Sequence, residues 1–291
     1  MLTRRTFSKT LLASMMLHPN TSTGSGKYKF ISNQNEIVVN IGECYVNFVE
    51  IPAGYGIVGS RDAFFLEKGQ QPKFRAIEIT KRFFFSKFLL TESDKKALRD
   101  TGVLPPETIT HQYVKTSPKS AASFGGWEMT PICLAFSKLL GATVTLPTEA
   151  QWEYACRAGS ETNFYNGDDE EKLKKIAWYR GNAQKDFSGS FIHPEIGLLE
   201  PNKFGLYDIL GLMGEPCIDD ISYTDATIDP IGRRSSPADF PRGDPRYYPM
   251  TVRGGHLVDP ASRVTCHRAS KYWFGPFGPP PIGLTMVIND S

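Results

Sequence analysis

Apolar and polar residues alternate with a period of two in several short stretches of the first 90 positions. Many of the apolar positions carry β-branched or aromatic residues, which is typical of strands that bury one face. Pro52-Ala53-Gly54 interrupts the pattern as a turn. The alternation predicts strands over residues 37–39, 45–51, 56–60 and 76–85.

Three later stretches carry the signals of helix boundaries. Thr148-Glu149-Ala150-Gln151 is a capping box, in which the first and fourth side chains bond each other's backbone N–H groups. Pro131 follows a second cap, at a first helical position where its missing N–H costs nothing. The caps predict helices that begin after Thr91, Thr130 and Thr148 and end at Gly102, Gly141 and Gly159.

Beyond residue 160 the periodicity is poor, and short strands joined by long loops are expected. Glycine and proline, at 26 and 21 residues, exceed their average usage of roughly 7% and 5%. We find no internal repeat and no low-complexity linker after residue 26. Residues 27–291 are therefore interpreted as one domain.

Charge and hydropathy exclude two broad classes of protein. The 33 basic and 31 acidic residues leave a net charge of +2, too balanced for a nucleic-acid binder that works by neutralising phosphates. No apolar run reaches the length of about 18 residues that a membrane span needs. We therefore expect neither a nucleic-acid partner nor a stable membrane span in the mature chain.

Residues 1–26 differ in kind from the rest. Arg4, Arg5 and Lys9 precede a short apolar run, Leu11–Leu17, and small polar residues follow. This is the three-part pattern of an export signal, and the arginine pair resembles the twin-arginine address. It predicts a periplasmic or other extracytoplasmic location. The alternative is a frayed basic N-terminus.

Five cysteines lie at positions 44, 133, 156, 217 and 266. An odd number cannot all pair within one chain, and no C-x-x-C spacing suggests a zinc ribbon. Cys133 and Cys156 fall on the apolar faces of predicted helices. We interpret these two as core residues.

The segment Leu146–Gly159, LPTEAQWEYACRAG, resembles the signature of the formylglycine-generating enzyme (sulfatase-modifying factor) family. Supporting matches are Phe48–Gly54, Pro201–Asp208 and Val252–Gly255, and the resemblance covers about residues 40–288. It implies a variant C-type-lectin-like fold: α+β, loop-rich, with few long regular elements.

The resemblance also implies a chemistry, which this sequence lacks the residues to perform. The aerobic family enzyme oxidises a substrate cysteine to formylglycine with oxygen and copper, and Cu(I) needs thiolate ligands. The family places two cysteines four and nine positions after the second glycine of its Gly-Gly pair. Here these positions are Asp259 and Val264. We therefore interpret the chain as a divergent member without the copper-binding cysteine pair, and expect neither copper nor formylglycine generation.

A structural calcium is the second site that the resemblance implies. Carried over position by position, the side chains of Asp208 and Glu215 and the carbonyls of Ile209, Gly211 and Met213 would hold it. Calcium takes six to eight oxygen ligands, so this set is chemically apt. The alternative is that Asp208 caps a turn and Glu215 is a solvated charge.

The catalytic residues are unknown, and the sequence offers three candidates. His256, Cys266 and His267 lie in the segment that carries the family's active site. Cys266 and His267 are adjacent, so on a strand they would point to opposite faces. His256 with Cys266 stays open as a nucleophilic pair, and His256, His267 and Asp259 as a 2-His-1-carboxylate iron site. The alternative is that these are scattered surface or core histidines.

Two functional classes remain open. One is a non-catalytic binding or accessory protein, of a maturation or immunity type, that presents a lectin-like surface to a protein or peptide partner. The aromatic and proline-rich segment 272–276 and the missing copper ligands favour it. The other is a periplasmic oxidoreductase of altered chemistry, for example in siderophore maturation, a role that the resemblance attaches to some relatives without the copper cysteines.

Overall fold

The computed structural model describes residues 28–31, 35–60, 74–106, 116–220, 224–234, 248–274 and 282–289. For residues 28–31, 248–249 and 272–274 it describes the backbone alone. The predicted export signal, residues 1–26, lies outside the described residues.

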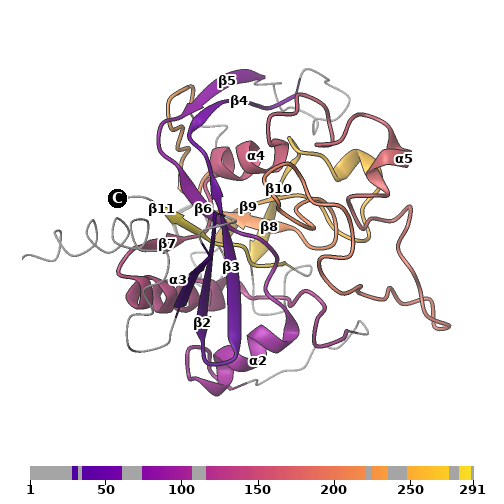
Figure 1. Cartoon of the computed structure of the whole chain (residues 1–291). Helices are drawn as coiled ribbons and strands as arrows, with labels where there is room; N and C mark the ends of the chain where they lie inside the picture. The colour runs from indigo at the N-terminus through magenta and orange to yellow at the C-terminus, as the bar shows by residue number, and fades with distance from the viewer. Residues whose placement is uncertain are drawn as a thin grey trace, which may run out of the picture.

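A six-stranded antiparallel sheet forms the centre of the molecule (Figure 1). The strands predicted near residues 37–39 and 45–51 are confirmed as neighbours in it. A strand from the other end of the sequence lies between two strands from the first half, where Val287 pairs with Phe85 on one side and Thr145 on the other. In spatial order the strands are β1 (Tyr28–Ile31), β2 (Glu36–Ile41), β3 (Cys44–Ile51), β6 (Phe83–Ser86), β11 (Val287–Asn289) and β7 (Thr143–Thr145).

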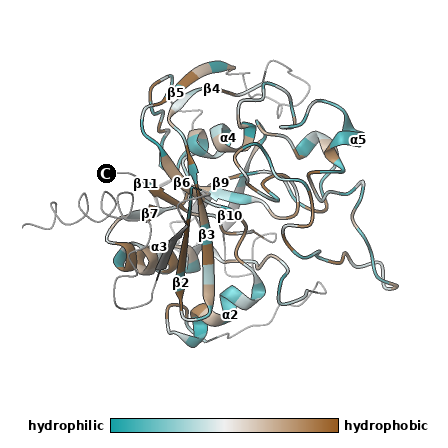
Figure 2. Cartoon of the chain, viewed as in Figure 1, coloured by the Kyte–Doolittle hydropathy of each residue, from teal (hydrophilic) through white to brown (hydrophobic). Residues whose placement is uncertain are grey.

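The central sheet buries both of its faces. Because side chains alternate across a strand, Phe84 of β6 packs into one core cluster while Phe83 and Phe85 pack into another. Helices α2 (Glu92–Asp100) and α3 (Gly126–Leu140) contribute to the first cluster, and α4 (Glu149–Arg157) contributes to the second. Figure 2 shows the central strands as predominantly hydrophobic and α2 as largely hydrophilic.

The strand predicted over residues 76–85 is two strands. β5 (Arg75–Ile79) pairs with β4 (Gly54–Val58) in a separate two-stranded sheet, whereas β6 belongs to the central sheet. The chain bends between them at Thr80, whose N–H donates to Asp229 Oδ1 at 2.8 Å. The alternation of apolar and polar residues shows which side chains are buried, but it does not show which sheet buries them. The pattern continues across the bend, so it predicted one strand instead of two.

The predicted helix caps are confirmed at two helices and displaced at the third. Thr91 and Thr148 both form complete capping boxes. Helix α3 begins one turn earlier than predicted, because the Glu128 carboxylate accepts the N–H of Gly125 at 2.7 Å and caps the helix there. Pro131 therefore lies inside the helix. Gly141 ends α3 with a φ of 62°, in the left-handed conformation that favours glycine.

Short elements and long loops follow residue 160, as expected. A three-stranded sheet has the order β10 (Ala269–Phe274), β9 (Tyr248–Arg253), β8 (Glu215–Cys217). The remaining elements are a single helical turn, α5 (Glu170–Leu173), and a 3₁₀ turn, η5 (Ala261–Arg263). In the described part of the chain, no helix combines the length and the apolar character needed to cross a bilayer.

Candidate functional site

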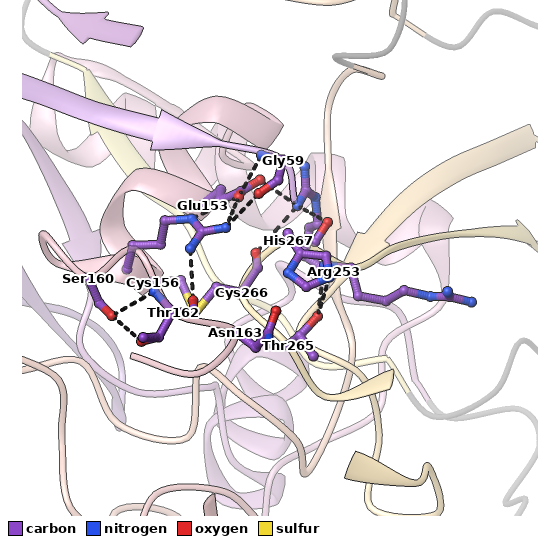
Figure 3. A network of polar contacts seen from close by, with 12 residues as sticks. Gly59, Glu153, Cys156, Ser160, Thr162, Asn163, Arg253, Thr265, Cys266 and His267 are labelled. Carbon is purple, nitrogen blue, oxygen red and sulfur yellow. Dashed lines mark hydrogen bonds and ion pairs between the residues drawn. The ribbon is translucent and has the colours of Figure 1, made fainter. Parts of the chain in front are cut away.

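Helix α4 carries three charged residues one turn apart on the face that it buries. Glu149, Glu153 and Arg157 follow an i, i+4, i+8 spacing, and Arg253 of β9 reaches between the two glutamates. Figure 3 shows Glu153 and Arg253 with the residues around them. Arg253 Nη1 lies 2.9 Å from Glu153 Oε2, and its Nη2 pairs with Glu149 Oε2. Arg157 Nη2 lies 2.8 Å from the other oxygen of Glu153. We call these four side chains the buried ion network.

The buried ion network also holds loops from distant parts of the chain. Arg157 donates to the carbonyl of Gly59 at 2.8 Å and to that of Thr162 at 2.9 Å. Arg253 donates to the carbonyl of His267 at 3.1 Å. Burial lowers the pKa of Arg253, but the two carboxylates raise it by more, so the net pKa lies well above its usual value. Arg253 therefore stays charged at any pH at which the protein is folded.

His256, the first catalytic candidate, is buried and bound to the backbone. Its Nδ1 accepts the N–H of Gly214 at 3.1 Å, and its own backbone N–H donates to Asp259 Oδ2 at 2.9 Å. A Cβ atom on Gly214 would lie 2.7 Å from His256 Cε1, so only glycine allows this approach. A second histidine, His193, lies nearby. Burial lowers the pKa of His193, and the charge of His256 lowers it further. His193 and His256 belong to distant parts of the sequence, so no local pattern reveals their approach.

Cys266 and His267 precede strand β10, so the premise that they lie on a strand is wrong. They are part of a turn in which the Thr265 hydroxyl accepts the N–H of Arg268 at 3.2 Å. Cys266 Sγ lies 3.5 Å from Cys156 Sγ, and His267 Nε2 lies 3.3 Å from Thr265 Oγ1. Burial lowers the pKa of His267 to about 4. His256 bonds to the backbone of Gly214, whereas the Cys266 thiol faces Cys156.

Residues 208–215 form a tight loop that returns to the network. Asp208, Gly211 and Leu212 all have positive φ angles, of 54°, 75° and 56°. The carboxylate of Glu215 lies beneath the loop, where its Oε2 accepts the indole N–H of Trp152 at 3.0 Å and the hydroxyl of Thr285 at 2.6 Å. Both acids are buried, so the reading of Glu215 as a solvated charge is wrong.

The loop has the oxygen atoms that a hard cation would need. Asp208 Oδ2 accepts the N–H of Gly197 at 2.6 Å, whereas its Oδ1 is buried without a hydrogen-bond partner among the described residues. No described backbone N–H donates to the carbonyls of Ile209, Gly211 or Met213. An unpartnered buried carboxylate oxygen is costly, and a cation would satisfy it.

Burial raises the pKa values of both carboxyl groups in this loop. That of Asp208 rises to about 6, opposed by the hydrogen bond from Gly197. That of Glu215 rises to about 8, opposed by Thr285 and Trp152 and assisted by the negative charge of Asp208. The two carboxylates are therefore near neighbours that repel each other when both are charged, and a calcium ion fits the pair.

A small polar pocket lies next to the buried ion network, at Arg157. Its volume is about 260 Å³, and its lining includes Gly59, Arg157, Asn163, Asp168 and His267. No local sequence pattern reveals this pocket, because its walls come from three segments that are distant in the chain, around residues 59–74, 157–168 and 267.

Comparison with known proteins establishes the family. The family model FGE-sulfatase, described as a sulfatase-modifying factor enzyme 1-like domain, matches residues 33–280. The chain belongs to this family. The family predicted from the signature around Trp152 is thereby confirmed.

Two relatives of known description share part of this domain. Formylglycine-generating enzyme of Mycobacterium tuberculosis (strain ATCC 25618 / H37Rv) is 30% identical over 148 residues, 47% of this chain and 46% of the enzyme. Chaperone protein LppX of Paenibacillus barcinonensis is 31% identical over 83 residues, 25% of this chain and 30% of that protein. The chain thus spans about half, or less, of the length of these relatives.

Solved structures confirm the expected fold. PvdO from Pseudomonas aeruginosa matches with a TM-score of 0.68 and 20% identity, over 87% of this chain and 98% of its own. Treponema denticola variable protein 1 matches with a TM-score of 0.65 and 18% identity, over 88% and 99%. The fold is the loop-rich, variant C-type-lectin-like α+β fold of the sulfatase-modifying factor family.

Asp259 and Val264, the two positions that the resemblance aligns with copper-binding cysteines, have structural roles in this chain. Asp259 caps a turn by accepting the N–H of His256, and Val264 is fully buried in the core. Among the described residues, no three His, Cys, Asp or Glu side chains come together as a metal site. The iron site considered for His256, His267 and Asp259 is therefore not assembled.

We predict that Arg253→Met lowers the free energy of unfolding by about 3–5 kcal/mol, because Glu149 and Glu153 would be left buried without a counter-charge. Urea unfolding followed by circular dichroism measures the change. Lys96→Met is the matched control: it breaks the exposed pair with Asp100 and should cost about 0.5 kcal/mol or less. Equal effects of the two substitutions would contradict the role given to the network.

We predict that His267 makes the protein sensitive to acid. Its ring is neutral when folded, whereas the unfolded chain binds a proton below the ordinary pKa of 6.5. Stability is therefore complete above pH 6.5 and falls as the pH approaches 4, with a loss of about 2 kcal/mol by pH 5. In urea titrations at pH 7 and pH 5, His267→Gln should lose about that much less than the parent chain. An unchanged difference between the two pH values would refute the assignment.

Proposed function

We propose that this chain is a non-catalytic binding or accessory protein that presents its family scaffold to a protein or peptide partner. The observation that carries the proposal is the identity and environment of Asp259 and Val264, the two positions that the resemblance aligns with the copper-binding cysteines. A turn-capping carboxylate at Asp259 and a core valine at Val264 leave no thiolate pair on this segment, and Cu(I) chemistry needs one.

A loop on the surface supports the binding role. Lys185 and Phe191 form a bridge at the base of the loop, and the Asp186 carboxylate accepts the N–H groups of Ser188 at 2.8 Å and Ser190 at 3.1 Å. Phe187, held between them, is fully exposed at 104% relative accessibility. An aromatic side chain on a preorganised turn loses little entropy when a partner covers it, and such residues often dominate protein interfaces.

The relatives are consistent with this proposal. One of them is described as a chaperone protein, which supports a protein as the partner. Arg4 and Arg5, in the segment interpreted as an export signal, support an extracytoplasmic location for the encounter.

The polar pocket favours a second candidate function. A cavity of about 260 Å³ lined by Arg157, Asp168 and His267 has the chemistry to hold a small polar molecule. The corresponding proposal is an oxidoreductase of altered chemistry, such as one acting in siderophore maturation. It would place substrate beside His267, whose lowered pKa keeps the ring neutral and able to accept a proton.

We predict that two variants separate these functions in a strain that lacks the gene. His267→Gln removes the ring beside which the oxidoreductase would place its substrate, and on the binding proposal it should restore the wild-type phenotype. Phe187→Ala should fail to restore it, because it removes the exposed aromatic anchor. The melting temperatures of both purified variants are compared with that of the parent, since Phe187 is fully exposed and its removal should leave the fold intact.

Two results would overturn the binding role. One is loss of function in a fully folded His267→Gln protein while Phe187→Ala retains it. The other is formation of an aldehyde from a cysteine-containing sulfatase peptide by the copper-loaded chain. The Mycobacterium tuberculosis relative is the positive control for the peptide assay.

We also propose that residues 208–215 bind a structural calcium ion. Asp208 and Glu215 would supply carboxylate oxygens, and Ile209, Gly211 and Met213 backbone carbonyls. The buried Oδ1 of Asp208 supports this set. The ion would offset the repulsion between two buried carboxylates and so stabilise a loop whose residues have unfavourable positive φ angles.

We predict that calcium raises the melting temperature and that a chelator reverses the effect. At a concentration about 100-fold above the dissociation constant, the ion should add about 2.7 kcal/mol of stability. Asp208→Asn should remove most of the difference between calcium and chelator in thermal melts. Asp229→Asn is the matched control, because Asp229 also has a positive φ, of 41°, and lies outside the loop. Identical melts of the parent with calcium and with chelator would reject the site.

A further inference from the structure

The thiols of Cys156 and Cys266 face each other in the core behind the polar pocket. Cys156 lies in the last turn of α4, and Cys266 lies in the turn between η5 and β10. Their sulfur atoms are 3.5 Å apart although the residues are 110 positions apart in sequence, and both side chains are fully buried (Figure 3). Of the five cysteines, these two form the sulfur–sulfur contact.

The backbone on each side of the pair is fixed by its own contacts. The Asn202 side chain donates to the carbonyl of Cys156 at 3.1 Å and to that of Ala155 at 2.7 Å. The N–H of Cys266 donates to the carbonyl of Asn163 at 2.8 Å. The thiols are thus held opposite each other by polar contacts that do not involve sulfur. A disulfide has an S–S distance of about 2.05 Å, so the sulfur atoms need to approach by roughly 1.5 Å.

We propose that Cys156 and Cys266 form a disulfide bond that cross-links helix α4 to the segment carrying the family's former copper positions. The oxidant is an external disulfide, either a thiol–disulfide exchange protein or oxidised glutathione. One thiolate attacks the external disulfide and displaces its first thiol, giving a mixed disulfide. The second thiolate then displaces the other thiol. One S–S bond replaces another, and the two electrons and two protons of Cys156 and Cys266 end on the released thiols.

Burial determines when this reaction takes place. The attacking species is the thiolate, and burial raises the pKa of Cys156 well above its ordinary value, with the neighbouring Cys266 adding to the shift. Neither sulfur reaches solvent in the folded protein. Exchange is therefore slow in the native state and fast only while α4 and residues 261–268 are still apart. Oxidised and reduced proteins do not interconvert readily once folded.

The cross-link acts on the same parts of the molecule as the buried ion network. Each cysteine is followed in the sequence by a residue that contacts the network. Arg157 comes directly after Cys156, and His267, the residue whose carbonyl accepts from Arg253, comes directly after Cys266. The disulfide would close a loop of more than 100 residues, and long loops gain the most from such closure. The pocket residues Arg157 and His267 would then be held together covalently as well as electrostatically. This inference does not depend on the proposed function.

Peptide mapping tests the bond directly. The full chain is unfolded, refolded in a buffer of oxidised and reduced glutathione, and alkylated under denaturing conditions without reductant. We expect a tryptic cross-link between the peptides of Cys156 and Cys266, two hydrogens lighter than the separate peptides, with Cys44, Cys133 and Cys217 alkylated. Alkylation of all five cysteines, or pairing of Cys156 or Cys266 with another cysteine, would overturn the proposal.

A thermal melt tests its structural effect. A reductant present during refolding should lower the melting temperature by roughly 5–15 °C. The reductant should have no effect on Cys266→Ala, because this variant cannot form the bond. Cys217→Ala, which removes another buried thiol of the same core, should respond like the parent. An equal response of Cys266→Ala and Cys217→Ala would overturn the role of the pair. If Cys266→Ala does not fold, the peptide map of the parent decides alone.

Discussion

The fold depends on four charged side chains that are buried together. Glu149, Glu153, Arg157 and Arg253 are each almost wholly inaccessible, and each is costly to bury alone. Together they satisfy one another and, through Arg157 and Arg253, bind the carbonyls of Gly59, Thr162 and His267. Such a network specifies one arrangement of α4, β9 and the loops around them, because any other arrangement would leave a charge without its partner.

This dependence explains how the scaffold can tolerate substitutions in the segment 256–268. The family signature falls on α4, so it encodes the network that holds the layers together. The segment 256–268 packs against that network, and the bonds that hold it there, from Arg253 to the His267 carbonyl and from the Cys266 N–H to Asn163, are made by its backbone. Asp259 and Val264 meet the demands of turn formation and packing without sulfur. A member of the family can therefore keep its fold and change its reaction, or give the reaction up.

Local patterns in the sequence accounted for the elements, and the resemblance accounted for the fold. The capping boxes at Thr91 and Thr148 predicted two helix starts correctly, because a cap is a contact between residues three positions apart. The start of α3 was misplaced because Thr130-Pro131 is itself a plausible cap, and the decisive contact, Glu128 with Gly125, lies one turn earlier. The glutamates of α4 share a spacing of four with Arg157, a pattern in the sequence that marks one face of the helix as charged beside the apolar face of Trp152. The contact of Cys156 with Cys266 and the approach of His193 to His256 join distant segments, so no local pattern could reveal them.

The position of β11 has a consequence for how the molecule is made. This strand, near residue 288, separates β6 from β7, so neither can complete its hydrogen bonding until β11 has arrived. During synthesis the central sheet stays open while some 200 residues emerge from the ribosome, with the edge of β6 exposed. Pairing over such sequence separations is slow and leaves strand edges available to other chains. The nascent protein should therefore depend on chaperones until the final strand is inserted.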